Sequence, residues 1–166
     1  MLTAHELIGF MSPALALEIL EAVHNTDKPV YRGALNAVAE ARKVRPIFLE
    51  RKPRAERHHE MIATLSKPRL DMLSLSILQS WLLKVETPML TGFLEALGIP
   101  HEKGTVDDLP KTMDDEKLKA AVEGLLAKHP PEKVAVYLRA FNDLNEAQWP
   151  NLAAMLDSDS RLQLGA

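Results

Sequence analysis

Proline limits the length of every regular element that this chain can form. Eleven prolines are spread over 166 residues, and most of them stand at the head of a segment whose apolar residues recur with helical spacing. Proline is tolerated in the first turn of a helix, where its missing amide hydrogen has no partner to lose, but it breaks a helix interior. We therefore predict short helices that begin at or near Pro13, Pro29, Pro53, Pro68, Pro88, Pro131 and Pro150.

The apolar spacing predicts an all-α fold of about eight or nine helices. No run shows the alternation of a strand, and 46% hydrophobic residues suffice for a packed core in a chain of this length. We predict a single all-helical domain over residues 1–166. Its helices are expected at residues 4–11, 13–25, 29–43, 54–66, 68–84, 88–98, 113–128 and 131–143, with a weaker ninth at 149–157.

The helix predicted at residues 68–84 is expected to be the buried centre of the fold. Its apolar residues cover most of the helical circumference, and a helix that is apolar all round is buried all round. Its serines can return a hydroxyl hydrogen bond to the preceding turn, while the other helices show one apolar stripe and should pack around it. The apolar residues are Leu70, Met72, Leu73, Leu75, Ile77, Leu78, Trp81, Leu82 and Leu83.

Two stretches of the chain repeat one pattern. KPVYRGALNAV at 28–38 and TPMLTGFLEAL at 87–97 share proline, glycine, leucine and alanine at an offset of 59 residues. Glycine in a helix interior costs ~1 kcal/mol relative to alanine. We therefore expect a close helix crossing at Gly33 and at Gly92 that offsets this cost.

A partial third copy of the pattern follows Pro150, after a step of 62 residues. One interpretation is a degenerate helical repeat, with pseudo-repeats over residues 12–67 and 68–129 and a partial third over 130–157. The alternative is a chance similarity between amphipathic helices that begin with proline.

Composition excludes several classes of function. The chain has no cysteine, which removes disulfides, thiolate nucleophiles and cysteine-based metal sites and favours a cytoplasmic protein. No apolar run is long enough to span a membrane, so we expect no membrane partner. The net charge of -3 argues against nucleic acid as the main partner. Residues 1–83 carry eleven Lys/Arg against nine Asp/Glu, whereas residues 84–166 carry nine against fourteen.

The densest charge cluster is a basic segment between two predicted helices. Clustered arginine and lysine can bind phosphates or an acidic protein surface, and Lys67 and Arg69 around Pro68 extend the same surface. Because the second half of the chain is acidic, we favour a protein partner or self-association over nucleic acid; the alternative is an ordinary solvated loop. The candidate residues are Arg42, Lys43, Arg45, Arg51, Lys52, Arg54 and Arg57.

Two Glu-x-x-His pairs form a candidate metal site. Glu21 with His24 and Glu56 with His59 have the spacing that places a carboxylate and an imidazole on adjacent turns of one helix, as in di-iron bundles. His58 and His59 are both expected to point partly inward. The His-Glu-x-x-His motif of zinc proteases is absent.

Acidic residues supply two further candidates. An acidic segment between two predicted helices could bind a hard cation. Capping of the following helix is favoured, because carboxylates near a helix N-terminus interact favourably with the helix macrodipole. Asp71 at the start of the central helix would have a raised pKa if it were desolvated; a role as an acceptor for exposed first-turn amides is favoured instead. The segment contains Asp107, Asp108, Asp114, Asp115 and Glu116.

The sequence contains no motif for a catalytic nucleophile, a phosphate loop or a dinucleotide fold, so no cofactor is expected. The predicted function is therefore a non-catalytic helical domain for protein-protein interaction or scaffolding. One alternative is a metal-dependent, di-iron-like enzyme that uses the two Glu-x-x-His pairs. A second is a nucleic-acid accessory protein that uses residues 42–57.

Overall fold

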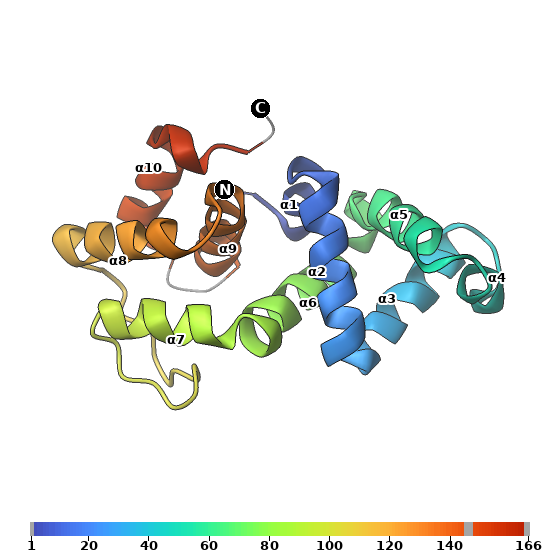
Figure 1. Ribbon diagram of the computed structural model, residues 1–166, viewed down its shortest axis with the longest axis horizontal. Coiled ribbons are helices and arrows are strands. Elements are labelled where there is room, and N and C mark those ends of the chain that lie inside the picture. Colours follow the sequence, from blue (N-terminus) through green and yellow to red (C-terminus); the bar gives the residue numbers. More distant parts are fainter. Residues whose placement is uncertain (1, 145–147, 165–166) are drawn as a thin grey trace. The chain divides into compact units, whose positions relative to one another are not determined.

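The computed structural model describes residues 2–144 and 148–164, and over these residues its regular structure is helical apart from one isolated β-bridge. The predicted all-α class is confirmed. Among the described residues, no helix combines the length and the apolar character needed to cross a bilayer. The chain divides into two compact units, Leu2–Val85 and Glu86–Ala166, which we call the N-terminal unit and the C-terminal unit (Figure 1).

The N-terminal unit contains six α-helices and two short helical turns. Proline occupies the first or second position of α2, α3 and α4 and the first position of η1, as the proline spacing predicts. The five-residue α4 was not predicted, because it is too short to show periodicity. The elements are α1 (Ala4–Phe10), α2 (Pro13–Thr26), α3 (Lys28–Ala41), α4 (Pro46–Glu50), α5 (Arg54–Leu65), the 3-10 turn η1 (Pro68–Leu70), α6 (Asp71–Ser80) and the π-helical turn η2 (Trp81–Val85).

Within this unit, α6 packs against α1, α2, α3 and α5. Ile77, Leu78 and Trp81 are at most 2% exposed. Burial all round the helix is wrong, since Met72 is 69% and Leu83 56% exposed and Leu73 and Leu75 are only half-buried. The predicted continuous helix over 68–84 is also divided into η1, α6 and η2. A small unit does not have enough neighbouring helices to cover every side of this segment.

The serines of α6 use their hydroxyls in two ways. Ser76 donates to the carbonyl oxygen of Met72 one turn earlier, with 3.1 Å between oxygens, as predicted. Ser74 instead donates to the carbonyl oxygen of Leu65 in α5, and Ser80 donates to the carboxylate of Asp27. The two buried serines therefore link α6 to other elements of the unit.

Asp27 is a buried acid that joins three elements. Its carboxylate accepts from the Val30 amide in the first turn of α3 (N to O 3.5 Å), from the Ser80 hydroxyl (2.8 Å) and from the Lys84 ammonium (2.9 Å). The Lys84 hydrogen bond, followed by the Ser80 one, holds the pKa of Asp27 below its usual value. Sequence analysis missed this residue, although an aspartate two positions before Pro29 is a helix-start signal.

Over its described residues, 86–144 and 148–164, the C-terminal unit contains four α-helices and one 3-10 turn. α7 packs on α8, α8 on α9, and α9 on both α10 and η3. The rings of Phe93, Phe141 and Trp149 form its aromatic core, with successive centroids 5.3 and 5.5 Å apart. The Trp149 indole nitrogen donates to the Pro110 carbonyl oxygen at 2.7 Å and so holds the long connection between α7 and α8. The elements are α7 (Thr87–Ala96), α8 (Asp115–Lys128), α9 (Pro131–Asp143), α10 (Pro150–Ser158) and η3 (Ser160–Leu162).

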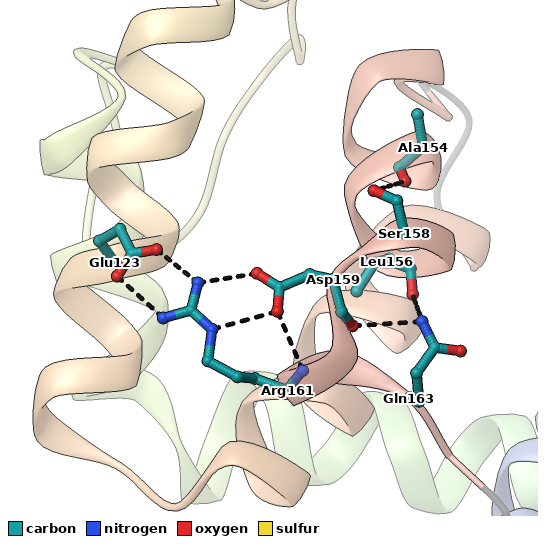
Figure 2. Close-up of polar contacts among 7 residues, drawn as sticks. All are labelled: Glu123, Ala154, Leu156, Ser158, Asp159, Arg161 and Gln163. Atoms are coloured by element: carbon teal, nitrogen blue, oxygen red, sulfur yellow. Dashed lines mark hydrogen bonds and ion pairs between the residues drawn. The ribbon is translucent and has the colours of Figure 1, made fainter.

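A surface ion-pair network fastens η3 to α8. Figure 2 shows the guanidinium of Arg161 between the carboxylates of Glu123 and Asp159. Its hydrogen bonds hold the pKa of both carboxyl groups below the usual values. Because the carboxylates are close to solvent, the network positions the end of the chain more than it stabilises the unit.

The two copies of the repeated pattern form α3 and α7, and four pairs of equivalent positions are buried in both copies. Tyr31, Ala34, Leu35 and Val38 are buried in α3, as are Leu90, Phe93, Leu94 and Leu97 at or directly after α7. Gly33 and Gly92 both lie on the exposed side, and a β-carbon built on either meets no atom within 4 Å. The predicted close helix crossings are therefore wrong, while the degenerate repeat stays a prediction.

Because space is open at both glycines, we expect Gly33→Ala and Gly92→Ala each to stabilise the protein by about 0.5–1 kcal/mol. Gly98→Ala is the matched control. Gly98 follows α7 with a φ of +72°, a conformation that alanine adopts only with strain, so this variant should be destabilised. Urea unfolding of the three variants tests the prediction, and a loss of stability at Gly33 or Gly92 contradicts it.

Candidate functional site

The basic segment runs from the end of α3 through α4 into the start of α5, and several of its cations have internal partners. Arg42 donates from Nε to the Thr64 hydroxyl (2.9 Å) and from Nη2 to the Glu60 carbonyl oxygen (3.2 Å). The Lys52 ammonium lies 2.7 Å from Oε1 of Glu60. These contacts fasten the end of α3 and the loop before α5 to the body of α5.

Arg54 and Arg57 also make contacts within the unit. The Arg54 guanidinium pairs with the Glu21 carboxylate of α2, with 2.7 Å between Nη1 and Oε1. Arg57 donates from Nη1 to the carbonyl oxygen of Glu50 at the end of α4 (3.3 Å). Four of the seven predicted binding cations therefore have a structural role in holding α5 against its neighbours.

The other three cations, Lys43, Arg45 and Arg51, are exposed, and over residues 2–144 and 148–164 no carboxylate lies in ion-pair contact with them. Lys43 has a φ of 58° where the chain leaves α3, and the amide of Val44 bonds back to the Ala39 carbonyl oxygen at 3.0 Å. This tight turn directs the following residues outward.

Large apolar side chains are interleaved with the unpaired cations. Val44 is 40%, Ile47 45% and Phe48 53% exposed. Leu49, only 2% exposed, anchors α4 in the core, and the Glu50 carboxylate pairs with Arg32 of α3. We call residues 43–51 the α4 surface: three exposed apolar side chains and three unpaired cations on a short anchored helix and the turn before it.

A second polar cluster lies between α2, α3 and α5. His58 is 2% exposed, and its Nε2 shares a hydrogen bond with the Tyr31 hydroxyl at 2.8 Å. Its Nδ1 lies 3.5 Å from a carboxylate oxygen of Glu21, and the ring centroid of His24 is 5.9 Å from that of His58. Burial, with the nearby charge of Arg57, lowers the pKa of His58 to about 4, while Glu21 opposes the shift.

The predicted metal ligands are not brought together. Glu21 faces Arg54 and His58, the Glu56 carboxylate lies 3.9 Å from the Lys52 ammonium, and His59 is exposed. The inward orientation predicted for both histidines therefore holds for His58 and fails for His59. In the described part of the chain, no three His, Asp or Glu side chains are placed to hold a metal ion.

The acidic segment before α8 serves the helix start. Asp114 is the N-cap and accepts from the Lys117 amide at 3.0 Å, and Asp115 accepts from the Asn151 side-chain amide at 2.7 Å. Asp114 thus has the capping role that the sequence favours, whereas the Asp115 contact links α8 to α10. Asp107, Asp108 and Glu116 are exposed.

The pKa of Asp71 is lowered, so the alternative of a raised pKa for this residue is wrong. Its Oδ1 accepts from the backbone amide of His5 at 3.0 Å and lies 2.6 Å from the His5 ring nitrogen Nδ1. These hydrogen bonds lower the pKa of Asp71, the backbone bond more strongly, because they favour the carboxylate over the neutral acid. Asp71 thus ties α1 to the start of α6, through a partner that sequence spacing does not identify.

Comparison of the chain with protein-family models, with curated proteins and with solved structures finds no significant match.

The burial of neutral His58 predicts a pH dependence of stability. The unfolded chain takes up a proton at His58 near its ordinary pKa of 6.5, whereas the folded chain does so near 4. Between these two pKa values the unfolded chain binds more protons than the folded chain, so the free energy of unfolding falls as the pH falls from 6.5 towards 4. The expected loss is on the order of 2 kcal/mol. In His58→Gln, which keeps a polar partner for Tyr31, this part of the pH dependence should disappear.

Urea unfolding at a series of pH values between these limits measures the effect. His59→Gln is the matched control, because the same substitution at the exposed neighbour should leave the wild-type pH dependence unchanged. Parallel stability profiles for wild type and His58→Gln would show that His58 is protonated equally in the folded and unfolded states.

Proposed function

We propose that this chain is a non-catalytic interaction module that docks an acidic protein surface on its α4 surface. The observation that carries the proposal is the combination of Val44, Ile47 and Phe48, all exposed, with unpaired cations in nine consecutive residues. Large apolar side chains grouped on a surface are costly to leave in water and are typical of interaction sites. The lack of cysteine supports placing the module in the cytoplasm.

The chemistry of this surface favours an acidic partner with apolar side chains of its own. Phe48 and Ile47 supply a centre that a partner can desolvate, and arginine at the rim pairs bidentately with carboxylates. Rim charges mainly raise the association rate and orient the partner. Because Lys43, Arg45 and Arg51 pair with no carboxylate of the described residues, pairing them with a partner breaks no ion pair in that part of the chain.

A second copy of the chain meets the charge requirement. Residues 86–166 carry eight Lys/Arg against fourteen Asp/Glu, whereas residues 2–85 carry twelve against nine. Opposite net charges on the two units make contact between the N-terminal unit of one copy and the C-terminal unit of another electrostatically favourable, most strongly at low ionic strength. We therefore take the acidic unit of a second copy as the partner to be tested.

Sedimentation velocity of the full chain at about 20 mM and about 300 mM salt tests this proposal, since the Debye length differs several-fold between them. We expect reversible self-association at low salt that weakens at high salt. Arg45→Glu combined with Arg51→Glu should abolish it, and Phe48→Ser should weaken it at both salt concentrations because the apolar contact is not screened.

Two controls make the outcome specific. Met72→Ser removes another exposed apolar side chain of the same unit, and Lys28→Glu reverses another exposed charge; both should associate as the wild type does. A monomer at low salt overturns the proposal. Gel shifts with mixed oligonucleotides at the same salt concentrations provide a second test: binding that falls steeply with salt would indicate the nucleic-acid function instead.

A further inference from the structure

An open pocket of about 360 Å³ lies in the N-terminal unit at the ends of α3 and α5, and the proposed function does not use it. Its walls come from the last residue of α3 and the residue after it, from the last turn of α5 and from the η1 turn. The lining residues are Ala41, Arg42, Thr64, Lys67, Arg69 and Leu70.

Every charged residue that lines the pocket is a cation. Arg42 is oriented before any ligand arrives, because its Nε donates to the Thr64 hydroxyl (2.9 Å) and its Nη2 to the Glu60 carbonyl oxygen (3.2 Å). Lys67 and Arg69 are exposed, and no carboxylate of the described chain lies in ion-pair contact with either side chain. The pocket therefore combines one preorganised guanidinium, whose Nη1 lies 3.6 Å from Oε1 of Glu60, with two cations that have no carboxylate partner among the described residues.

The backbone holds the two unpaired cations beside each other. Lys67 has the extended conformation that a following proline imposes, with a ψ of 146°. The Leu70 amide then bonds back to the Lys67 carbonyl oxygen at 3.1 Å, and the Leu70 side chain is 7% exposed. Pro68 and buried Leu70 thus fix a turn that presents Lys67 and Arg69 at the rim of one cavity.

Helix electrostatics explain only part of this cluster. Arg42 directly follows α3 and Lys67 follows α5, where a cation interacts favourably with the helix macrodipole. Arg69 lies at the opposite kind of position, two residues before the first residue of α6. A cation at a helix start is unfavourable, so the dipoles of α3, α5 and α6 do not account for Arg69.

We propose that this pocket binds a phosphate monoester. A phosphate monoester carries about -1.5 to -2 charges at neutral pH and three acceptor oxygens. The Arg69 guanidinium, the Lys67 ammonium and the remaining Nη donors of Arg42 can pair with these three oxygens, whereas a carboxylate offers only two oxygens and a single charge. The volume exceeds that of the phosphate group alone and falls at the lower end of small-ligand pockets. Ala41 and Leu70 supply an apolar wall for the carbon skeleton of the ester.

The ester can come from a free metabolite or from a phosphorylated side chain, and the experiment separates the two. Isothermal titration of the full chain uses glucose 6-phosphate, a phosphoserine peptide and its unphosphorylated form, all at constant ionic strength. Stronger binding of glucose 6-phosphate assigns a metabolite, and stronger binding of the phosphopeptide assigns a modified protein. Failure of both phosphate probes to bind better than the unphosphorylated peptide overturns the proposal.

Variants test whether binding occurs in this pocket. Lys67→Gln and Arg69→Gln should each lower the affinity for the phosphate probe by about tenfold or more, as expected for loss of a hydrogen bond between charged groups. Arg45→Gln removes the same charge from the α4 surface and should change the affinity less than about twofold. Because Lys67 and Arg69 are exposed, their variants should unfold at the wild-type temperature, which excludes misfolding as the cause.

The pH dependence supplies an independent readout. A phosphate monoester loses its second proton near pH 6, so binding should tighten as the pH rises from about 5 to about 7.5, whereas binding of the permanently charged sulfate should not. Equal weakening by Arg45→Gln and Arg69→Gln would show a diffuse surface attraction and would overturn the pocket assignment.

Discussion

One buried carboxylate determines how the N-terminal unit packs. Asp27 is 4% exposed, and an isolated charge at such a depth would be strongly destabilising. Its oxygens instead accept from the first turn of α3, from Ser80 at the end of α6 and from Lys84 in η2. These elements must stay at the corner between α2 and α3, because moving any of them leaves the charge short of a donor. In η2, Trp81 and Leu82 are buried while Lys84 extends to Asp27.

The sequence predicted the helices well because proline chemistry is local. A proline at the head of an amphipathic segment favours a helix start through its own fixed φ and missing amide, and the predicted starts at Pro13, Pro131 and Pro150 agree with the structure to within one residue. The predicted close helix crossings at the glycines are wrong, although the sequence already indicated that these glycines are exposed. Gly33 precedes buried Leu35 by two residues, about 200° around a helix, so the periodicity already placed this glycine opposite the apolar stripe.

The polar sites were less predictable because their partners come from other helices. His58 lies seven residues before buried Leu65 and therefore on the same side of α5, whereas exposed His59 does not. The spacing thus indicates that His58 turns inward, but not what it contacts there. The Tyr31 hydroxyl and the Glu21 carboxylate that face it lie on α3 and α2. The same holds for Asp71, whose partner His5 is 66 residues away. Local patterns identify which residues turn inward, but they do not identify what those residues contact there.

The basic segment shows why a run of charge predicts only part of a surface. Glu60 and Glu21 compensate the cations that lie over α5, while Glu50, the acid directly before Arg51 in sequence, pairs with Arg32 of α3 instead. That ion pair and buried Leu49 hold α4 in place, and they also occupy the carboxylate that could have neutralised its cations. The anchoring of α4 and the unpaired charge on its outer side therefore have the same structural cause.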